Sequence, residues 1–313
     1  VPGTIGGEIW TKEEEMFGKL LLERLHPVLF SYLERELRIR EEISGQLEKA
    51  AGEGAKKRLN EVEEEKQLIL AALHRDNVGL LVGGDDAEVT HVFLALDLTE
   101  TTLEEAVRAG ADMIITHHPM IFEGQKKINN HSFTGRRILK LIRNRIQYYA
   151  MHTNYDVLGM AELSADYLKL TDREVLSVTA HTEQGEEGFG RVGCLPYKMT
   201  LKECGEFVKE ALALNDVRIY GDPDTMVEKA AICTGSGKSM ISDVLAKGAD
   251  VYVTGDIDHH TGIDAVASGL PIIDAGHYGT EYIFMKAMRK ILEEKYPSLQ
   301  ITCAKVKSPY MIL

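Results

Sequence analysis

The chain changes character along its length in how apolar and polar positions alternate. Up to about residue 75, apolar residues recur every three or four positions among many Glu, Lys and Arg residues, as one face of a helix requires. The first run comprises Leu22, Leu25, Leu29, Leu33 and Leu37, and the second comprises Leu59, Val62, Ile69 and Leu73. A turn at residues 52–54 separates the runs. We therefore predict a helical hairpin, the helical extension, whose role is packing or oligomerisation.

From Val78 onward, short apolar runs alternate with helical patterns. The apolar runs cover residues 92–98, 111–116, 147–151, 230–233, 251–254 and 271–275. Continuous apolar runs of this length are typical of buried parallel strands. Thr102 and Glu105 predict a capping box for the first helix, which should end at Gly110. Strand–helix alternation predicts an α/β fold. Residues 178–224 are rich in glycine and predict a connecting region.

Composition and charge narrow the classes of function. Against 36 Lys and Arg residues stand 49 Asp and Glu residues, a formal net charge of -13. Such a chain is a poor binder of nucleic-acid backbone and of anionic membranes. There is no long apolar run typical of a membrane span and no signal-peptide pattern. The four cysteines form no zinc-binding spacing, so we expect reduced thiols and a cytoplasmic protein.

Most of the histidines follow predicted strands. His117 and His118 follow the strand at 111–116, His152 follows 147–151, His259 and His260 follow 251–254, and His277 follows 271–275. Ligands of α/β folds bind at the carboxyl ends of strands, so these side chains could meet in one site.

The residue types at these ends suit a metal centre. His277 and Glu281 are four residues apart at the start of a predicted helix and share one face, and Asp156 adds a hard oxygen ligand. The predicted ligand set is His117, His118, Asp156, His277 and Glu281. Such a mixed set suits zinc, iron, manganese or cobalt, and two ions together could activate water. Each residue alone also has an ordinary structural explanation, such as a helix cap for Asp156.

Residues 235–239, with sequence GSGKS, resemble part of a phosphate-binding loop. The first glycine of the complete motif is missing, since neither Cys233 nor Ala231 supplies it. A tight strand-to-helix turn is the preferred interpretation.

Several motifs occur in an order that is typical of one family. They are DNVGLLVG from Asp76, ITHHPMIF from Ile115, HTNYD from His152, CTGSGKS from Cys233, TGDIDHH from Thr254 and DAGHYGTE from Asp274. Over about residues 76–313 the chain resembles the NGG-interacting-factor-three-like family, also called GTP cyclohydrolase type I-like proteins or type-two homologues. The helical extension and Arg75, where the family usually has an aromatic residue, depart from its pattern.

The resemblance implies two similar α/β lobes, with mixed or parallel sheets, that face each other across a dinuclear metal cleft. It also implies a ring-shaped homohexamer, the ligand set given above with Glu281 bridging, and His152 and His260 near the site as proton-transfer groups. Asn154 would lie beside them. The predicted domains are the extension at 1–75, a first lobe at 76–177, the connecting region at 178–224 and a second lobe at 225–313.

Two functions remain open. The first is a metal-dependent hydrolase acting on a small, nucleotide-like substrate, GTP cyclohydrolase-like according to the resemblance, with two divalent ions as cofactors. The alternative is a metal-binding regulatory or adaptor protein without catalysis. The net negative charge does not exclude a small phosphate-bearing ligand, because bound divalent ions invert the local field.

Overall fold

The computed structural model describes two compact units, Val1–Val78 and Gly79–Leu313. In the second unit it describes every residue except 123, 153–154, 183–184, 306–307, 309 and 311–313, and in the first only part of residues 4–69 together with Val78. In the first unit, β1 (Thr4–Ile5) pairs antiparallel with β2 (Glu8–Ile9). The described residues between 35 and 69 are helical, and Ser44 donates a hydrogen bond to Glu63. Leu22, Leu25, Leu29, Leu33 and Leu73 lie outside the described residues, so the hairpin stays a prediction.

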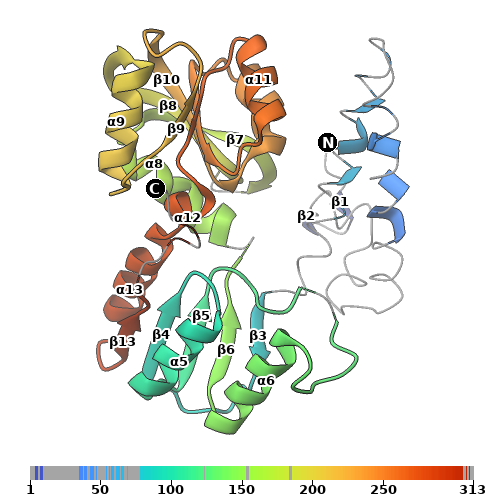
Figure 1. The fold of residues 1–313 in the computed structure, drawn as a ribbon, viewed down its shortest axis with the longest axis vertical. Helices are drawn as coiled ribbons and strands as arrows, with labels where there is room; N and C mark the ends of the chain where they lie inside the picture. Colours follow the sequence, from blue (N-terminus) through green and yellow to red (C-terminus); the bar gives the residue numbers. More distant parts are fainter. Residues whose placement is uncertain are drawn as a thin grey trace. The chain divides into compact units, whose positions relative to one another are not determined.

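The second unit contains two mixed sheets (Figure 1). The five-stranded sheet has the order β13-β4-β5-β6-β3, in which only β3 runs antiparallel to its neighbour. Its strands are β3 (Gly79–Val82), β4 (His91–Ala95), β5 (Met113–Thr116), β6 (Gln147–Ala150) and β13 (Gln300–Cys303). The helices α5 (Glu100–Ala109) and α6 (Phe133–Asn144) connect β4, β5 and β6, and α13 (Ile283–Lys295) leads into β13.

The six-stranded sheet has the order β7-β8-β10-β11-β12-β9, with parallel pairing only between β10, β11 and β12. Its strands are β7 (Thr171–Thr182), β8 (Gly185–Thr200), β9 (Arg218–Tyr220), β10 (Met226–Ser236), β11 (Val251–Gly255) and β12 (Ile272–Asp274). The helices of this part are η2 (Asp156–Met160), α8 (Ala161–Tyr167), α9 (Leu201–Ala211), η3 (Lys238–Met240), α10 (Ile241–Ala246), α11 (His259–Ala267) and α12 (His277–Glu281). In Figure 1, α9 and α11 flank this sheet.

The α/β fold predicted from the sequence is confirmed as a mixed fold with two sheets. The path of the chain differs from the predicted domains in two places. Residues 178–224, predicted to connect the lobes, contribute the end of β7 and all of β8 and β9 to the six-stranded sheet, and they also form α9. The last strand, β13, returns to the five-stranded sheet beside β4. The glycines of 178–224 therefore allow close strand packing, since a Cβ on Gly188 would lie 1.9 Å from the Ser177 carbonyl oxygen.

In both sheets, an aspartate just before a parallel strand accepts backbone hydrogen bonds from the neighbouring segment. Asp112 precedes β5, and one of its carboxylate oxygens accepts hydrogen bonds from the backbone N–H groups of Thr90 and His91. Asp250 precedes β11 and accepts from two backbone N–H groups at the same relative position, those of Glu228 and Lys229. Each carboxylate thereby ties the start of one strand to its parallel neighbour.

Two apolar clusters lie on opposite faces of the six-stranded sheet, because its side chains alternate between the faces. Ile232 and Val253 join a cluster that continues into the five-stranded sheet, where it includes Leu94. Tyr252 and Ile272 belong to a second cluster. Successive residues of a strand point to opposite faces, so both faces of the sheet are buried. The continuous core under the two sheets holds their strand ends in fixed positions.

Helix α5 begins one turn before the predicted cap. Thr99 is its N-cap, with an extended backbone, and its hydroxyl accepts from the Thr102 N–H while the Thr102 side chain accepts from the Thr99 N–H. The predicted pairing of Thr102 with Glu105 was therefore wrong. Gly110 ends the helix in the left-handed region, at φ 69°, as predicted. Among the described residues, no helix is long and apolar enough to cross a membrane.

Candidate metal centre

His117 and His118 are held by a continuation of the β4–β5 ladder. The His117 N–H donates to the Ala95 carbonyl and the His118 N–H donates to the Leu96 carbonyl. The His117 side chain is fully buried and packs against the Phe284 ring, with centroids 5.4 Å apart. Two adjacent histidines at a strand end thus have little freedom to rotate away.

His277 and Glu281 occupy the first and last positions of α12, which follows β12 through Gly276. The Glu281 side chain is 6% exposed and its Oε2 lies 3.1 Å from His277 Nε2. Gly235, in the GSGKS turn, makes room for this carboxylate, since a Cβ there would lie 2.3 Å from Glu281 Oε1. The turn therefore serves close packing against Glu281, in line with the structural interpretation of the motif.

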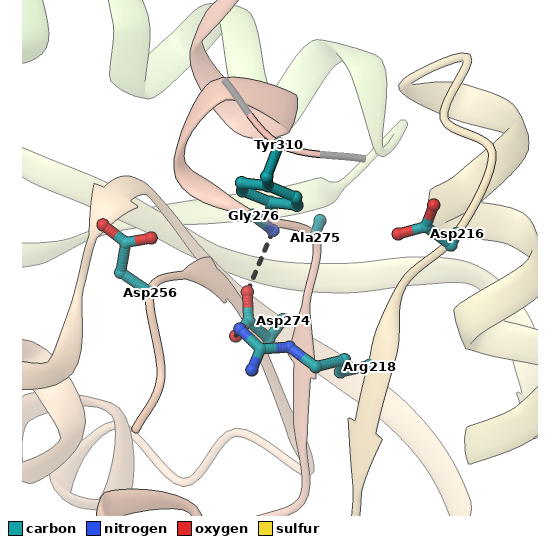
Figure 2. Close-up of a pocket in the computed structure, with 7 residues that line it drawn as sticks. All are labelled: Asp216, Arg218, Asp256, Asp274, Ala275, Gly276 and Tyr310. Carbon is teal, nitrogen blue, oxygen red and sulfur yellow. Dashed lines mark hydrogen bonds and ion pairs between the residues drawn. The ribbon is translucent and has the colours of Figure 1, made fainter. Parts of the chain in front are cut away.

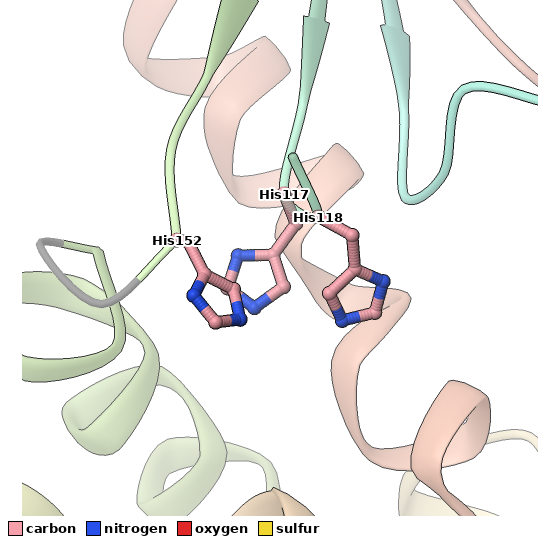
Figure 3. Close-up of side chains that lie close together, drawn as sticks. All are labelled: His117, His118 and His152. Carbon is pink, nitrogen blue, oxygen red and sulfur yellow. The ribbon is translucent and has the colours of Figure 1, made fainter. Parts of the chain in front are cut away.

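Asp156 and His152 come from the segment after β6. The carbonyl of His152 accepts from the N–H groups of Tyr155 and Asp156. Asp156 opens η2, a π-helical turn that leads into α8. Figure 3 shows the His152 ring beside the rings of His117 and His118, and its centroid lies 5.4 and 5.8 Å from theirs. Asn154 lies outside the described residues.

These side chains form three groups whose ligand atoms lie within 4.8 Å of one another. The first is His117, Asp156 and Glu281, the second is His118, His277 and Glu281, and the third is His117, His118 and His152. Asp156 Oδ1 is 3.3 Å from His117 Nε2, and Glu281 Oε2 is 2.9 Å from His118 Nε2. The structure therefore brings together all five predicted ligands, and the groups could hold a metal.

In each of three histidines, the second ring nitrogen has its own partner. Nδ1 of His117 is 2.7 Å from the Met151 carbonyl oxygen. Nδ1 of His118 is 2.9 Å from Asp97, and Nδ1 of His277 is 2.8 Å from Asp256. Donation from Nδ1 leaves the Nε2 lone pair for a metal, and such outer partners are typical of metal-ligating histidines. All three Nε2 atoms face Glu281.

Unsatisfied buried atoms give a test of whether these residues fit a metal. His117 Nε2, Asp156 Oδ1 and Glu281 Oε2 are buried and form no hydrogen bond with any described residue. They lie close together without hydrogen-bond geometry, and burial without a partner is costly for such groups. A cation among them would satisfy all three, so the donor set fits a metal.

The carboxylates of the cluster determine the direction in which the pKa values of its histidines shift. Burial lowers the pKa of His117, but the charges of Asp156 and Glu281 outweigh burial and raise it to about 10. Burial likewise lowers the pKa of His277, whereas Glu281 and Asp256 raise it to about 9. For Glu281, burial raises the pKa, and the neighbouring histidines bring it well below its usual range. The cluster thus favours positive charge at its centre.

Two further aspartates, which the sequence patterns did not single out, belong to the site. Asp97 follows β4 and Asp256 follows β11, so both stand at strand ends like the histidines. Asp256 adopts a left-handed backbone, at φ 57°, uncommon outside glycine. His260 lies in the first turn of α11, exposed beside His259, and belongs to none of the metal-holding groups formed by described residues. Its role in proton transfer stays a prediction.

Comparison with known proteins identifies the family of the chain. The family profile Duf34/NIF3 (NGG1p interacting factor 3) matches residues 56–309. The chain belongs to the DUF34/NIF3 family. The match to this family begins twenty residues before Asp76, within the helical residues of the first unit.

Relatives in the DUF34/NIF3 family include bacterial proteins named GTP cyclohydrolase 1 type 2 homolog. One from Clostridium perfringens is 34% identical over 239 residues, which cover 75% of this chain and 90% of that protein. One from Clostridium acetobutylicum is 36% identical over 220 residues, covering 70% and 82%. A solved Staphylococcus aureus hypothetical protein is similar with a TM-score of 0.69 at 29% identity, covering 76% of this chain and 92% of that one. A Bacillus cereus protein related to NIF3 gives 0.68 at 27% identity, covering 75% and 93%.

Proposed function

We propose that the chain binds two divalent metal ions and hydrolyses a small, nucleotide-like substrate. The observation that carries this proposal is the sharing of Glu281 between two groups of ligands, one with His117 and Asp156 and the other with His118 and His277. A carboxylate has two oxygens and can bridge two cations. Zinc, iron and manganese all accept such a mixture of imidazole and carboxylate ligands.

The chain's own residues would orient the metal ligands, exclude bulk water and move a proton. The carbonyl of Met151 and the carboxylates of Asp97 and Asp256 fix the histidine rings with Nε2 inward. The burial of His117 and Glu281 keeps bulk water from the deep side of the centre. His152, whose ring lies beside those of His117 and His118, would accept or return a proton. When bound, a pair of divalent ions supplies Lewis acidity that activates water and stabilises negative charge on the substrate.

The experiment is a turnover assay on the full chain loaded separately with zinc, iron or manganese. The relatives' name makes GTP the first substrate to test, followed by other nucleotides and small phosphoesters. We expect turnover that is lost on chelation and in Glu281→Gln, with Glu293→Gln, an exposed carboxylate elsewhere, unchanged. Full activity in ion-free Glu281→Gln protein would contradict the proposal. Tight metal binding without turnover of any substrate would favour the regulatory or adaptor function. The homohexamer stays a prediction, which light scattering tests.

A further inference from the structure

A cavity adjoins the candidate metal centre. It has a volume of about 360 Å³ and is lined by Asp216, Arg218, Asp256, Asp274, Ala275, Gly276 and Tyr310 (Figure 2). Two of its residues reach the centre directly, since Asp256 Oδ2 is 2.8 Å from His277 Nδ1 and Gly276 precedes His277 in the chain. Its volume falls at the small end of ligand sites, which span roughly 300–1,000 Å³. A molecule in this cavity would therefore lie beside the metal ligands.

The cation of the cavity is already neutralised. The guanidinium of Arg218 donates to the buried Asp274 carboxylate, with a distance of 2.5 Å between Nη2 and Oδ2. Asp274 also accepts from the backbone N–H groups of Ile257 and Gly276. Arg218 and Asp274 thus satisfy each other and shape the wall, and the cavity offers little to a phosphate.

Two carboxylates of the cavity are available to accept hydrogen bonds from a ligand. Asp256 directs Oδ2 to His277, which leaves Oδ1 available. Asp216, in the loop before β9, is exposed and forms neither a hydrogen bond nor an ion pair with another described residue. Ionised carboxylates only accept hydrogen bonds, so they select a ligand edge that carries N–H donors.

An aromatic side chain completes the cavity. In Figure 2 the Tyr310 ring lies over Gly276. Gly276 leaves room for it, because a Cβ there would be 3.0 Å from the Tyr310 hydroxyl oxygen, and its φ of 74° suits glycine. Tyr310 is 58% exposed, so its ring is accessible to a planar group. Stacking on an aromatic side chain is a common way to hold a flat heterocycle.

We propose that this cavity binds a flat, nitrogen-rich ring of the substrate, with its N–H edge toward Asp216 and its face against Tyr310. Asp256 lies on the opposite side of the cavity, next to His277 of the metal centre (Figure 2). The remainder of the same molecule would reach the centre formed by His277 and Glu281. This inference rests on the proposed function and assigns the two parts of one substrate to two neighbouring sites, the donor-bearing ring to the acidic cavity and the anionic part to the ions.

Binding of free nucleosides to the chelator-stripped chain of 313 residues tests the cavity without phosphate or metal. Guanosine presents adjacent N–H donors, whereas uridine presents one N–H between two carbonyl oxygens that the carboxylates would repel. By calorimetry we expect guanosine to bind at least about tenfold more tightly than uridine. Asp216→Asn and Tyr310→Ala should each weaken guanosine binding by roughly five- to tenfold. Both side chains are exposed, so the variants should fold, and Asp224→Asn, outside the cavity, should bind as the parent chain does.

The outcomes separate this proposal from the proposed function. Guanosine binding that is weakened in Asp216→Asn and Tyr310→Ala supports the cavity, even where metal-loaded protein hydrolyses nothing. Equal affinity for guanosine and uridine, absence of binding, or unchanged binding in both variants overturns the cavity, even where metal-dependent turnover is found.

Discussion

Replacing Gly235 tests whether the turn before η3 makes room for the Glu281 carboxylate. Its φ of 68° lies in the left-handed region, where a residue with a Cβ costs about 1–2 kcal/mol of folding free energy. In Gly235→Ala, the new Cβ would lie 2.3 Å from Glu281 Oε1 and 3.3 Å from Glu281 Cδ. Ordinary contact begins at 3.4 Å, so the carboxylate oxygen must retreat by about 1 Å, since atoms this close repel steeply.

Gly248 provides the matched control. Its φ is 65°, almost the same, but a Cβ there would meet nothing within 4 Å. Gly248→Ala should therefore carry only the backbone cost of about 1–2 kcal/mol. Denaturant unfolding of ion-stripped protein measures this cost for both variants.

Metal affinity then isolates the effect on Glu281. Displacing a ligand whose position sets the geometry of the centre should lower the affinity in Gly235→Ala by at least about tenfold, as changes next to metal ligands commonly do. Competition with a chromophoric chelator measures it. Parent-like metal affinity in Gly235→Ala, or an equal loss in Gly248→Ala, would refute the assignment of this turn to the carboxylate.

Three further predictions follow from contacts outside the ligands. Asp97→Asn should lower metal affinity by about 10–100-fold, measured by chelator competition, because the neutral amide no longer supports His118 Nδ1–H as a charged acceptor. Arg191→Met should lower the free energy of unfolding by about 1–3 kcal/mol, because the Gly188 and Gly190 carbonyls lose a buried donor; an unchanged denaturation midpoint would contradict this. Hydrogen bonds from the Thr90 side chain and the Thr90 and His91 backbone lower the pKa of Asp112, so its ionised form stabilises the fold above about pH 4. The stability difference between the parent chain and Asp112→Asn should therefore shrink as the pH falls below that point, and a constant difference from pH 7 to pH 3 would refute the role of the charge.

The strand ends could be predicted from the sequence because continuous apolar runs mark buried strands. That rule placed His117 and His118 after β5 and His277 after β12, and parallel strands bring such ends to one edge. Asp156 was predicted as a ligand in the same way, because it follows the strand that ends near His152. The π-helical turn that begins at Asp156 was not predicted, since no local pattern revealed it.

Other parts of the site depend on contacts between distant segments. Asp97 and His118 are 21 residues apart, as are Asp256 and His277, and only the packed sheets show that these pairs meet. Gly235 looked like part of a phosphate loop because its need for space arises from Glu281, far along the chain. The return of β13 to the first sheet escaped prediction for the same reason, since parallel pairing with β4 joins residues about two hundred positions apart.

The central claim is that two ions share Glu281. The most direct measurement is a crystal structure of the metal-loaded protein with anomalous diffraction recorded at the absorption edge of the bound metal. We predict two anomalous peaks, one contacted by His117 and Asp156 and the other by His118 and His277, with a Glu281 oxygen contacting each. A single ion at full occupancy, or two ions of which only one contacts Glu281, would contradict the claim.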